Sequence, residues 1–157
     1  MLTSMAMISF DELRLRARIN LTKAQLAADV TLIQGRRATD QVVMSQMTGN
    51  TWTNLNCDTT TQLHLQPVCV ADSDQSWKNL NGDVVAPRDS WGNPFTFDEN
   101  EQNIVAPGTC GYDCVMSAGP DGILDGWVNV NSDDIYIIVP HFYCPNGPVP
   151  MTIGVQY

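Results

Sequence analysis

The chain of 157 residues contains 17 acidic and 8 basic residues, a formal net charge of −9, and 43% of its residues are hydrophobic. This length and composition suit one globular domain and argue against a second full domain or a disordered acidic tail. Apolar runs such as residues 135–139 cover only a few positions, far short of the roughly 18 that cross a bilayer. We therefore expect neither a transmembrane helix nor a complete signal peptide in this sequence.

Charge is distributed unevenly along the chain. Residues 1–40 contain six basic and four acidic residues, whereas residues 41–157 contain two basic and thirteen acidic residues. A body this acidic repels phosphate, so the composition disfavours nucleic-acid binding, and it indicates cationic partners only weakly. The arginines of the first 40 residues are typical of the solvated side of a helix.

The stretch from Asp11 to about residue 48 predicts one long helix. It has no proline and one glycine, and its apolar residues recur at helical spacing at Leu15, Ile19, Leu26, Val30 and Ile33. Such a helix would be about 55 Å long, so one end must project, and we expect Leu15, Ile19 and Leu26 to be partly exposed. We expect residues 1–10 to be a flexible start or a remnant of expression.

The remaining segments differ from the predicted helix in composition and in the spacing of their apolar residues. Residues 49–87 are rich in Thr, Asn, Asp and Ser and predict a long irregular connection. Residues 88–140 contain short strand-like pieces at 95–97, 112–116 and 135–139, followed by a tail at 141–157. The order predicts an α+β fold in which a long N-terminal helix packs on a small antiparallel β-sheet.

The five cysteines form no CxxC pair, which disfavours a zinc ribbon and favours disulfides formed in an oxidising compartment. We expect Cys57 to pair with Cys69, because the polar, turn-like segment between them closes a short loop that can contribute about 3 kcal/mol. We expect Cys144 to pair with either Cys110 or Cys114. The sequence therefore predicts two disulfide bridges and one free thiol.

Residues 117–134 form an acidic, glycine-containing segment that can hold a cation. Its carboxylates are Asp121, Asp125, Asp133 and Asp134. Calcium takes six to eight oxygen ligands in a forgiving geometry, and the segment has no histidine or cysteine that would favour zinc or copper. The EF-hand spacing is missing, and the alternative is an Asp-Gly turn with solvated acids.

No arrangement of residues predicts catalysis. The two histidines, His64 and His141, lie in no nucleophile motif. Adjacent acids such as Asp133 and Asp134 point to opposite faces of a strand, which does not suit a pair of general acid and base. We expect that the protein is not an enzyme.

Three ordered motifs carry a resemblance to a known family. The segments PRDSWGNPFTF at 87–97, SAGPDG at 117–122 and SDDI at 132–135 resemble the C-terminal half of type IV pilin-like proteins, most closely the major pseudopilin of type II secretion. The resemblance implies the type IV pilin fold and a structural subunit that assembles into a filament with copies of itself and related pilins. It also implies calcium binding in the acidic segment, most securely at Asp121, then at Asp125 and at Asp133 or Asp134.

The sequence departs from that family in two respects. It lacks the basic leader and the apolar first half of the helix, which we interpret as removal of the membrane-embedded part. The resemblance implies that this part anchors the subunit in the inner membrane before it moves to the periplasm or to an extracellular pilus. The second departure is the cysteine content: within the family that the chain resembles, the secretion pseudopilin usually lacks disulfides whereas true pilins commonly have one near the C terminus, and this favours a pilus subunit. The alternatives are a type II secretion pseudopilin or, from another class, a free calcium-dependent extracytoplasmic binding module.

Overall fold

The protein is described by a computed structural model that covers residues 2–49, 57–82, 86–99, 113–124 and 132–140, with side chains from Phe10 onward. The described elements form an α+β layout with a long N-terminal helix and a small antiparallel sheet. In chain order they are α1 (Leu2–Asp40), α2 (Met44–Thr48), the 3-10 turn η2 (Leu63–Leu65), α3 (Pro67–Asn81), β1 (Thr96–Asp98), β2 (Asp113–Ser117) and β3 (Ile135–Val139).

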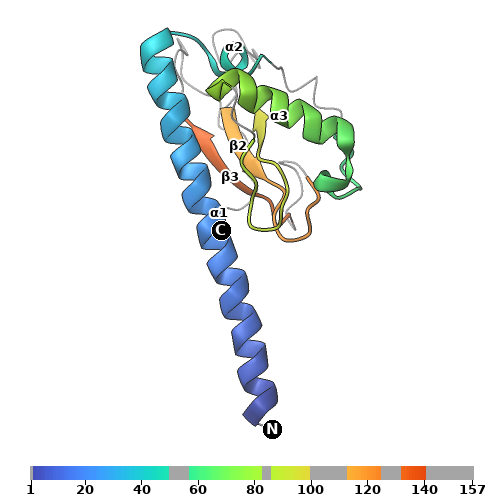
Figure 1. Ribbon diagram of the computed structural model, residues 1–157. Coiled ribbons are helices and arrows are strands. Elements are labelled where there is room, and N and C mark those ends of the chain that lie inside the picture. The colour runs from blue at the N-terminus through green and yellow to red at the C-terminus, as the bar shows by residue number, and fades with distance from the viewer. Residues whose placement is uncertain (1, 50–56, 83–85, 100–112, 125–131, 141–157) are drawn as a thin grey trace.

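The N-terminal end of α1 projects beyond the rest of the described fold, as Figure 1 shows. Every side chain from Phe10 to Arg18 is exposed, and Ile19 is the first that is half-buried. The predicted long helix and its projecting end are therefore confirmed. The helix already begins at Leu2, so it continues through the segment for which the sequence predicted a flexible start.

The predicted single helix is wrong at its C-terminal end, because the structure breaks it after Asp40. Gln41 has a φ of +57°, and the helix resumes only at Met44. The β-branched pair Val42 and Val43 follows the break, and β-branched residues have low helix propensity. The break lets α2 turn back and bury Met44 and Met47 in the core.

The sheet has the strand order β1-β2-β3, and both pairings are antiparallel. Phe97 lies opposite Val115, which lies opposite Ile137. The strand predicted at residues 135–139 is confirmed at the same bounds. The coarse α+β prediction therefore holds for the described residues.

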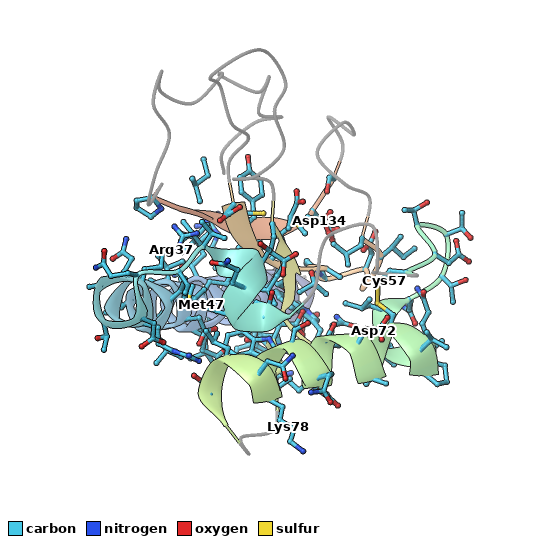
Figure 2. The ribbon with its side chains drawn as sticks, turned by 90° about the horizontal axis from the view of Figure 1, so that it is seen from above. Arg37, Met47, Cys57, Asp72, Lys78 and Asp134 are labelled. Carbon is cyan, nitrogen blue, oxygen red and sulfur yellow. A yellow bond between two sulfur atoms is a disulfide. The ribbon has the colours of Figure 1, made fainter. Side chains whose placement is uncertain are left out.

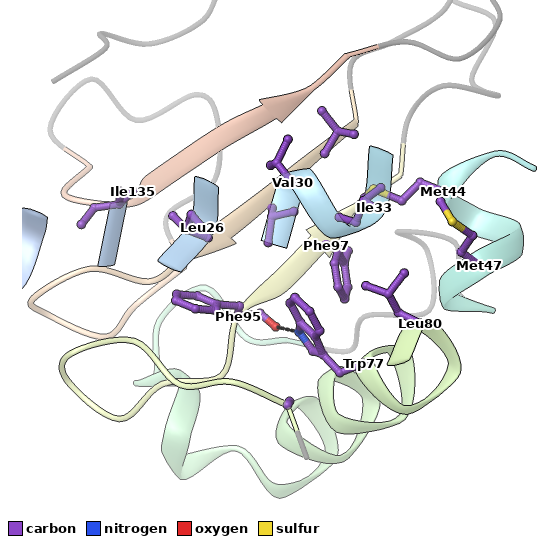
Figure 3. Packing of buried hydrophobic residues seen from close by; sticks show 13 residues of the cluster. Leu26, Val30, Ile33, Met44, Met47, Trp77, Leu80, Phe95, Phe97 and Ile135 are labelled. Atoms are coloured by element: carbon purple, nitrogen blue, oxygen red, sulfur yellow. Dashed lines mark hydrogen bonds between the residues drawn. The ribbon is translucent and has the colours of Figure 1, made fainter. Parts of the chain in front are cut away.

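The main core lies where α1, α3 and one face of the sheet meet (Figure 3). Trp77 of α3 donates its indole N–H to the Phe95 carbonyl at 2.9 Å, and its ring centroid lies 4.7 Å from that of Phe97. The helix α1 contributes Leu26, Val30 and Ile33. Leu26 is fully buried, so the expectation of partial exposure is wrong for it, whereas Leu15 and Ile19 are partly exposed as predicted.

A second core cluster lies on the opposite face of β2. Cys114 and Met116 alternate with Val115 along the strand, so they point away from the main core. They pack in one cluster with Leu63 of η2 and Cys69 of α3. The opposite face of β2 is therefore covered by η2 and the first turn of α3, whereas the rest of α3 packs with α1 in the main core.

The prediction of an irregular connection is wrong for α3. Pro67 occupies the first turn, where its missing N–H costs nothing, and the buried residues recur at helical spacing at Cys69, Ser73, Ser76, Trp77 and Leu80. Two members of this buried stripe are serines. Because serine counts as polar in a hydrophobic pattern, the helical period was not visible in the sequence.

Candidate functional site

The acidic segment between β2 and β3 brings Asp121 and Asp133 together. Asp133 Oδ2 accepts the Asp121 backbone N–H at 3.1 Å, and Asp121 Oδ1 accepts the Ile123 N–H at 2.8 Å. A Cβ atom at Gly119 would lie 2.2 Å from the Asp133 carbonyl oxygen, and Gly119 has a φ of +60°. Only glycine therefore allows the two halves of the segment to approach this closely.

The turn that carries Asp121 is fixed from outside by the residues that begin η2. The Leu63 N–H donates to the Gly122 carbonyl at 2.6 Å, and the Gln62 side-chain amide donates to the Asp121 carbonyl at 2.9 Å. The turn η2 is followed directly by α3, and Cys69 of α3 forms the disulfide with Cys57. The acidic turn is therefore bonded to the segment that the disulfide constrains.

The electrostatics at Asp133 favour a cation. Burial raises the pKa of Asp133, and the nearby Asp121 carboxylate raises it further. Asp133 Oδ1 is buried and has no hydrogen-bond partner in the part of the chain that the structure describes. A carboxylate with these properties is stabilised by a neighbouring positive charge.

The two carboxylates fit the oxygen-only chemistry of calcium, but the described residues do not supply a complete ligand set. Within those residues no group of three or more His, Cys, Asp or Glu side chains can hold a metal ion. Asp134 donates its N–H to Ser132 Oγ at 3.1 Å, next to the pair. Asp125 lies outside the described residues, so the structure brings together two of the four predicted ligands.

A turn at residues 89–93 supports the acidic segment, and the sequence did not identify its main residue. Asp89 Oδ1 accepts the N–H groups of Trp91 and Asn93, both at 2.9 Å. Asp89 Oδ2 accepts the Ser117 hydroxyl at 2.7 Å, and Ser117 Oγ in turn accepts the Gly119 N–H at 3.1 Å. The turn at residues 89–93 and the motif at residues 117–122 therefore meet where the acidic segment begins, although they lie apart in the sequence.

The turn also attaches to α1. Ser90 donates its hydroxyl to the Arg18 carbonyl at 3.0 Å, and Thr22 donates its hydroxyl to Ser90 Oγ at 3.0 Å. These contacts give the Trp-Gly-Asn-Pro turn an architectural role, because they attach it to α1. The signal for Asp89 was its place two residues before Trp91, a spacing at which an aspartate can accept a backbone N–H in an Asx-turn.

The helix α1 has a second apolar face, which the helical spacing from Leu15 to Ile33 did not reveal. Residues on a helix advance by about 100° each, so this face lies roughly opposite the face that packs on the sheet. All of its members are exposed, and the large ones have exposed fractions from 38% at Leu32 to 62% at Leu13. We call this face the outer stripe, and it consists of Phe10, Leu13, Ala17, Leu21, Ala24, Ala28 and Leu32.

The structure describes three of the five cysteines. Cys57 and Cys69 form the predicted disulfide, with their Cα atoms 5.1 Å apart, and Figure 2 labels Cys57. Cys114 is a buried free thiol in the structure. Cys110 and Cys144 lie outside the described residues. Burial raises the pKa of the Cys114 thiol, which disfavours the reactive thiolate.

Of the two histidines, His64 is exposed and its Nδ1 lies 3.0 Å from Asn93 Oδ1. His141 lies outside the described residues. Asn93 belongs to the turn at residues 89–93, so His64 contacts the turn that supports the acidic segment.

A scan against protein-family models finds no match, and searches of the curated proteins and of the solved structures find no similar protein. In the part of the chain that the structure describes, no helix combines the length and the apolar character needed to cross a bilayer.

Proposed function

We propose that this protein is a structural subunit of a type IV pilus, which acts by assembly with copies of itself and related pilins rather than by catalysis. The observation that carries the proposal is the outer stripe of α1. It adds to the resemblance of the three motifs in the C-terminal half of the chain.

The outer stripe has the properties of a helix-packing surface. From Phe10 to Leu32 it extends about 33 Å along the helix. Alanines at positions 17, 24 and 28 alternate with larger side chains, so another helix can approach closely and interdigitate. A continuous exposed apolar surface of this kind is typical of a protein interface.

The Cys57–Cys69 disulfide supports the location that this function needs. Disulfides persist in oxidising compartments, such as the periplasm and the cell exterior. In this proposal the subunit resides in the inner membrane before assembly and afterwards in the periplasm or in an extracellular pilus.

The assembly proposal is tested with charges in the outer stripe of the full-length protein. Leu21→Glu and Ala28→Glu should abolish filaments seen by electron microscopy of the producing cells, because a carboxylate would be desolvated in the interface. Gln34→Glu, at an exposed position of α1 outside the stripe, is the matched control and should assemble normally. Unchanged filaments in the Leu21 and Ala28 variants would refute the proposal.

The pilus and secretion alternatives are separated by deleting the gene. Loss of surface pili with normal secretion of exoenzymes identifies a pilus subunit, whereas the reverse result identifies a type II secretion pseudopilin. A full-length, epitope-tagged protein that is recovered only as a free periplasmic monomer would contradict both and would favour an extracytoplasmic binding module.

We also propose that the acidic segment binds calcium, and the approach of Asp121 to Asp133 is the observation that favours this. Binding to the folded state would raise the free energy of unfolding by about 2.7 kcal/mol at a hundredfold excess over Kd. Thermal melts in calcium and in chelator should therefore differ for the wild type and coincide for Asp121→Ala. The control Asp58→Ala alters an exposed carboxylate elsewhere and should keep the difference. Equal wild-type midpoints would exclude the site.

A further inference from the structure

A groove of about 830 Å³ lies between α1 and β3, at the point where α1 leaves the sheet. Its helix wall contains Leu15, Ile19 and Lys23, and its strand wall consists of residues 135–138. Pro120, Asp133 and Asp134 line the rest. We call it the α1–β3 groove. Its size is within the range of roughly 300–1,000 Å³ that is typical of sites that bury a whole ligand.

The groove combines apolar walls with a small excess of negative charge. Ile137 is half-buried in the strand wall, and Leu15 is 41% exposed in the helix wall. The charged lining residues are two aspartates and one lysine. A suitable occupant therefore offers apolar side chains beside a net positive charge.

The projecting end of α1 carries this combination. Phe10 and Leu13 are 54% and 62% exposed, and the Arg14 guanidinium carbon lies 4.2 Å from the centre of the Phe10 ring. Residues 10–18 contain three arginines against Asp11 and Glu12, so the charge of this end is opposite in sign to that of the groove.

We propose that the α1–β3 groove receives the projecting α1 end of a second copy of this chain. Phe10 and Leu13 of one copy then lie against the apolar walls of the next, and Arg14 and Arg18 lie on the side of Asp134, the groove carboxylate that takes no part in the contact between Asp121 and Asp133. This inference rests on the proposed assembly function and names the surface that takes the first part of the outer stripe.

The contact joins two different surfaces, a helix end and a groove. A pairing of this type is heterologous, so each copy still offers one unused helix end or groove after it has bound a neighbour. Such a contact gives an open chain of copies with a single direction when its rotation does not close into a ring, whereas pairing of two outer stripes across a two-fold axis closes at a dimer.

The test is intermolecular photo-cross-linking of the chain at high concentration. A donor copy carries benzoylphenylalanine in place of Leu13, and an acceptor copy is labelled with ¹⁵N so that mass spectrometry separates adducts between copies. We expect adducts on residues 135–138 and on the peptide around Leu15 of the acceptor. The acceptor variant Leu15→Arg/Asp134→Arg adds positive charge to the groove and should lower the adduct yield at least fivefold. Gln34→Arg is the matched control and should leave it unchanged.

Circular dichroism and melting midpoints confirm that each acceptor variant is folded before it is used. Adducts confined to the acceptor's outer stripe would overturn the groove assignment while leaving the assembly proposal intact. An unchanged yield with the Leu15→Arg/Asp134→Arg acceptor, or no adduct at all, would also overturn it. The assembly proposal itself fails separately, through normal filaments in the Leu21→Glu and Ala28→Glu variants.

Discussion

Asp89 is a buried carboxylate whose hydrogen bonds connect two motifs of the chain. It accepts bonds from the N–H groups of Trp91 and Asn93, the Asn93 side-chain amide and the Ser117 hydroxyl. Its exposed fraction is 6%. Because water cannot replace these bonds, the donors lose their partner when the carboxylate is removed.

Replacement of Asp89 by alanine should lower the free energy of unfolding by about 3 kcal/mol, because several buried donors are left unsatisfied. Urea unfolding measures this change. The control is Asp58→Ala, which also removes an acceptor of three hydrogen bonds but at an exposed position, and it should shift the midpoint much less. Equal shifts for the two variants would contradict the role assigned to burial.

Glu99 is a second buried carboxyl group, and its pKa makes stability depend on pH. Burial raises the pKa of Glu99 to about 7, the Thr48 hydroxyl bond lowers it, and Asp113 and Asp98 raise it. The folded state therefore holds the proton more tightly than the unfolded state. The associated stability is fully present below the unfolded pKa near 4.5 and is lost as the pH rises to about 7.

Glu99→Gln should remove this pH dependence while keeping an oxygen that accepts the Thr48 hydroxyl. Relative to the wild type, the variant should gain up to about 3 kcal/mol between pH 5 and pH 8. Urea titrations at both pH values give the difference. Burial also raises the pKa of Asp29 to about 7, so the parallel variant Asp29→Asn measures its separate share. A Glu99→Gln effect that is the same at both pH values would refute the assignment.

The start of α3 depends on the disulfide as well as on its own packing. Cys69 lies in the first turn of the helix, and its bridge to Cys57 attaches the preceding turn to it. In that turn the Gln66 side-chain amide donates to the carbonyls of Asp58 and Thr61 at 2.9 and 2.6 Å. The N-terminal end of α3 is therefore stabilised by a covalent bond and by hydrogen bonds, in addition to the helix propensity of its own residues.

The double variant Cys57→Ala/Cys69→Ala should lose about 3 kcal/mol of stability, since it releases a loop with a sequence separation of 12. Chemical unfolding of the oxidised protein measures the loss.

Denaturing thiol titration of the oxidised wild type should find one thiol, that of Cys114, with Cys110 paired to Cys144. Alkylation of the native protein should be slow, because the Cys114 thiol is buried. A count of five thiols in material from an oxidising compartment would contradict the extracytoplasmic assignment.

At the scale of the whole molecule, a buried ion pair joins the end of α1 to the start of β2. Arg37 donates to Asp113 Oδ2 and to the Pro140 carbonyl, and the two charged side chains are 4% and 1% exposed. Figure 2 shows Arg37 on the side of α1 that faces the strands. The pair connects the helix and the sheet at the end of the fold opposite the projecting helix.

Arg37→Ala and Asp113→Ala should each lower the free energy of unfolding by about 3–5 kcal/mol, because each leaves the other charge buried and uncompensated. The double variant should lose less than the sum of the two, with a coupling of about 2 kcal/mol in a double-mutant cycle. Strictly additive losses would show that the pair does not act as a unit.

The sequence by itself determined those features whose cause is local. The helical spacing from Leu15 to Ile33 predicted α1, the β-branched run at residues 135–139 predicted β3, and the short polar loop predicted the Cys57–Cys69 bridge. Each signal lies within a few residues of the structure that it predicts. The acidic composition of residues 117–134 is likewise a local signal, whereas the contact between Asp121 and Asp133, which are 12 residues apart, was not predicted.

Only the tertiary structure decided the features that depend on distant partners. Asp89 and Ser117 are separated by 28 residues, and Arg37 and Asp113 by 76, and nothing in a local pattern shows that such polar groups become buried together. The helix α3 was missed because its buried face includes serines, whose burial depends on the surrounding fold. The outer stripe and the α1–β3 groove likewise exist only because the sheet covers one face of α1 and leaves the other exposed.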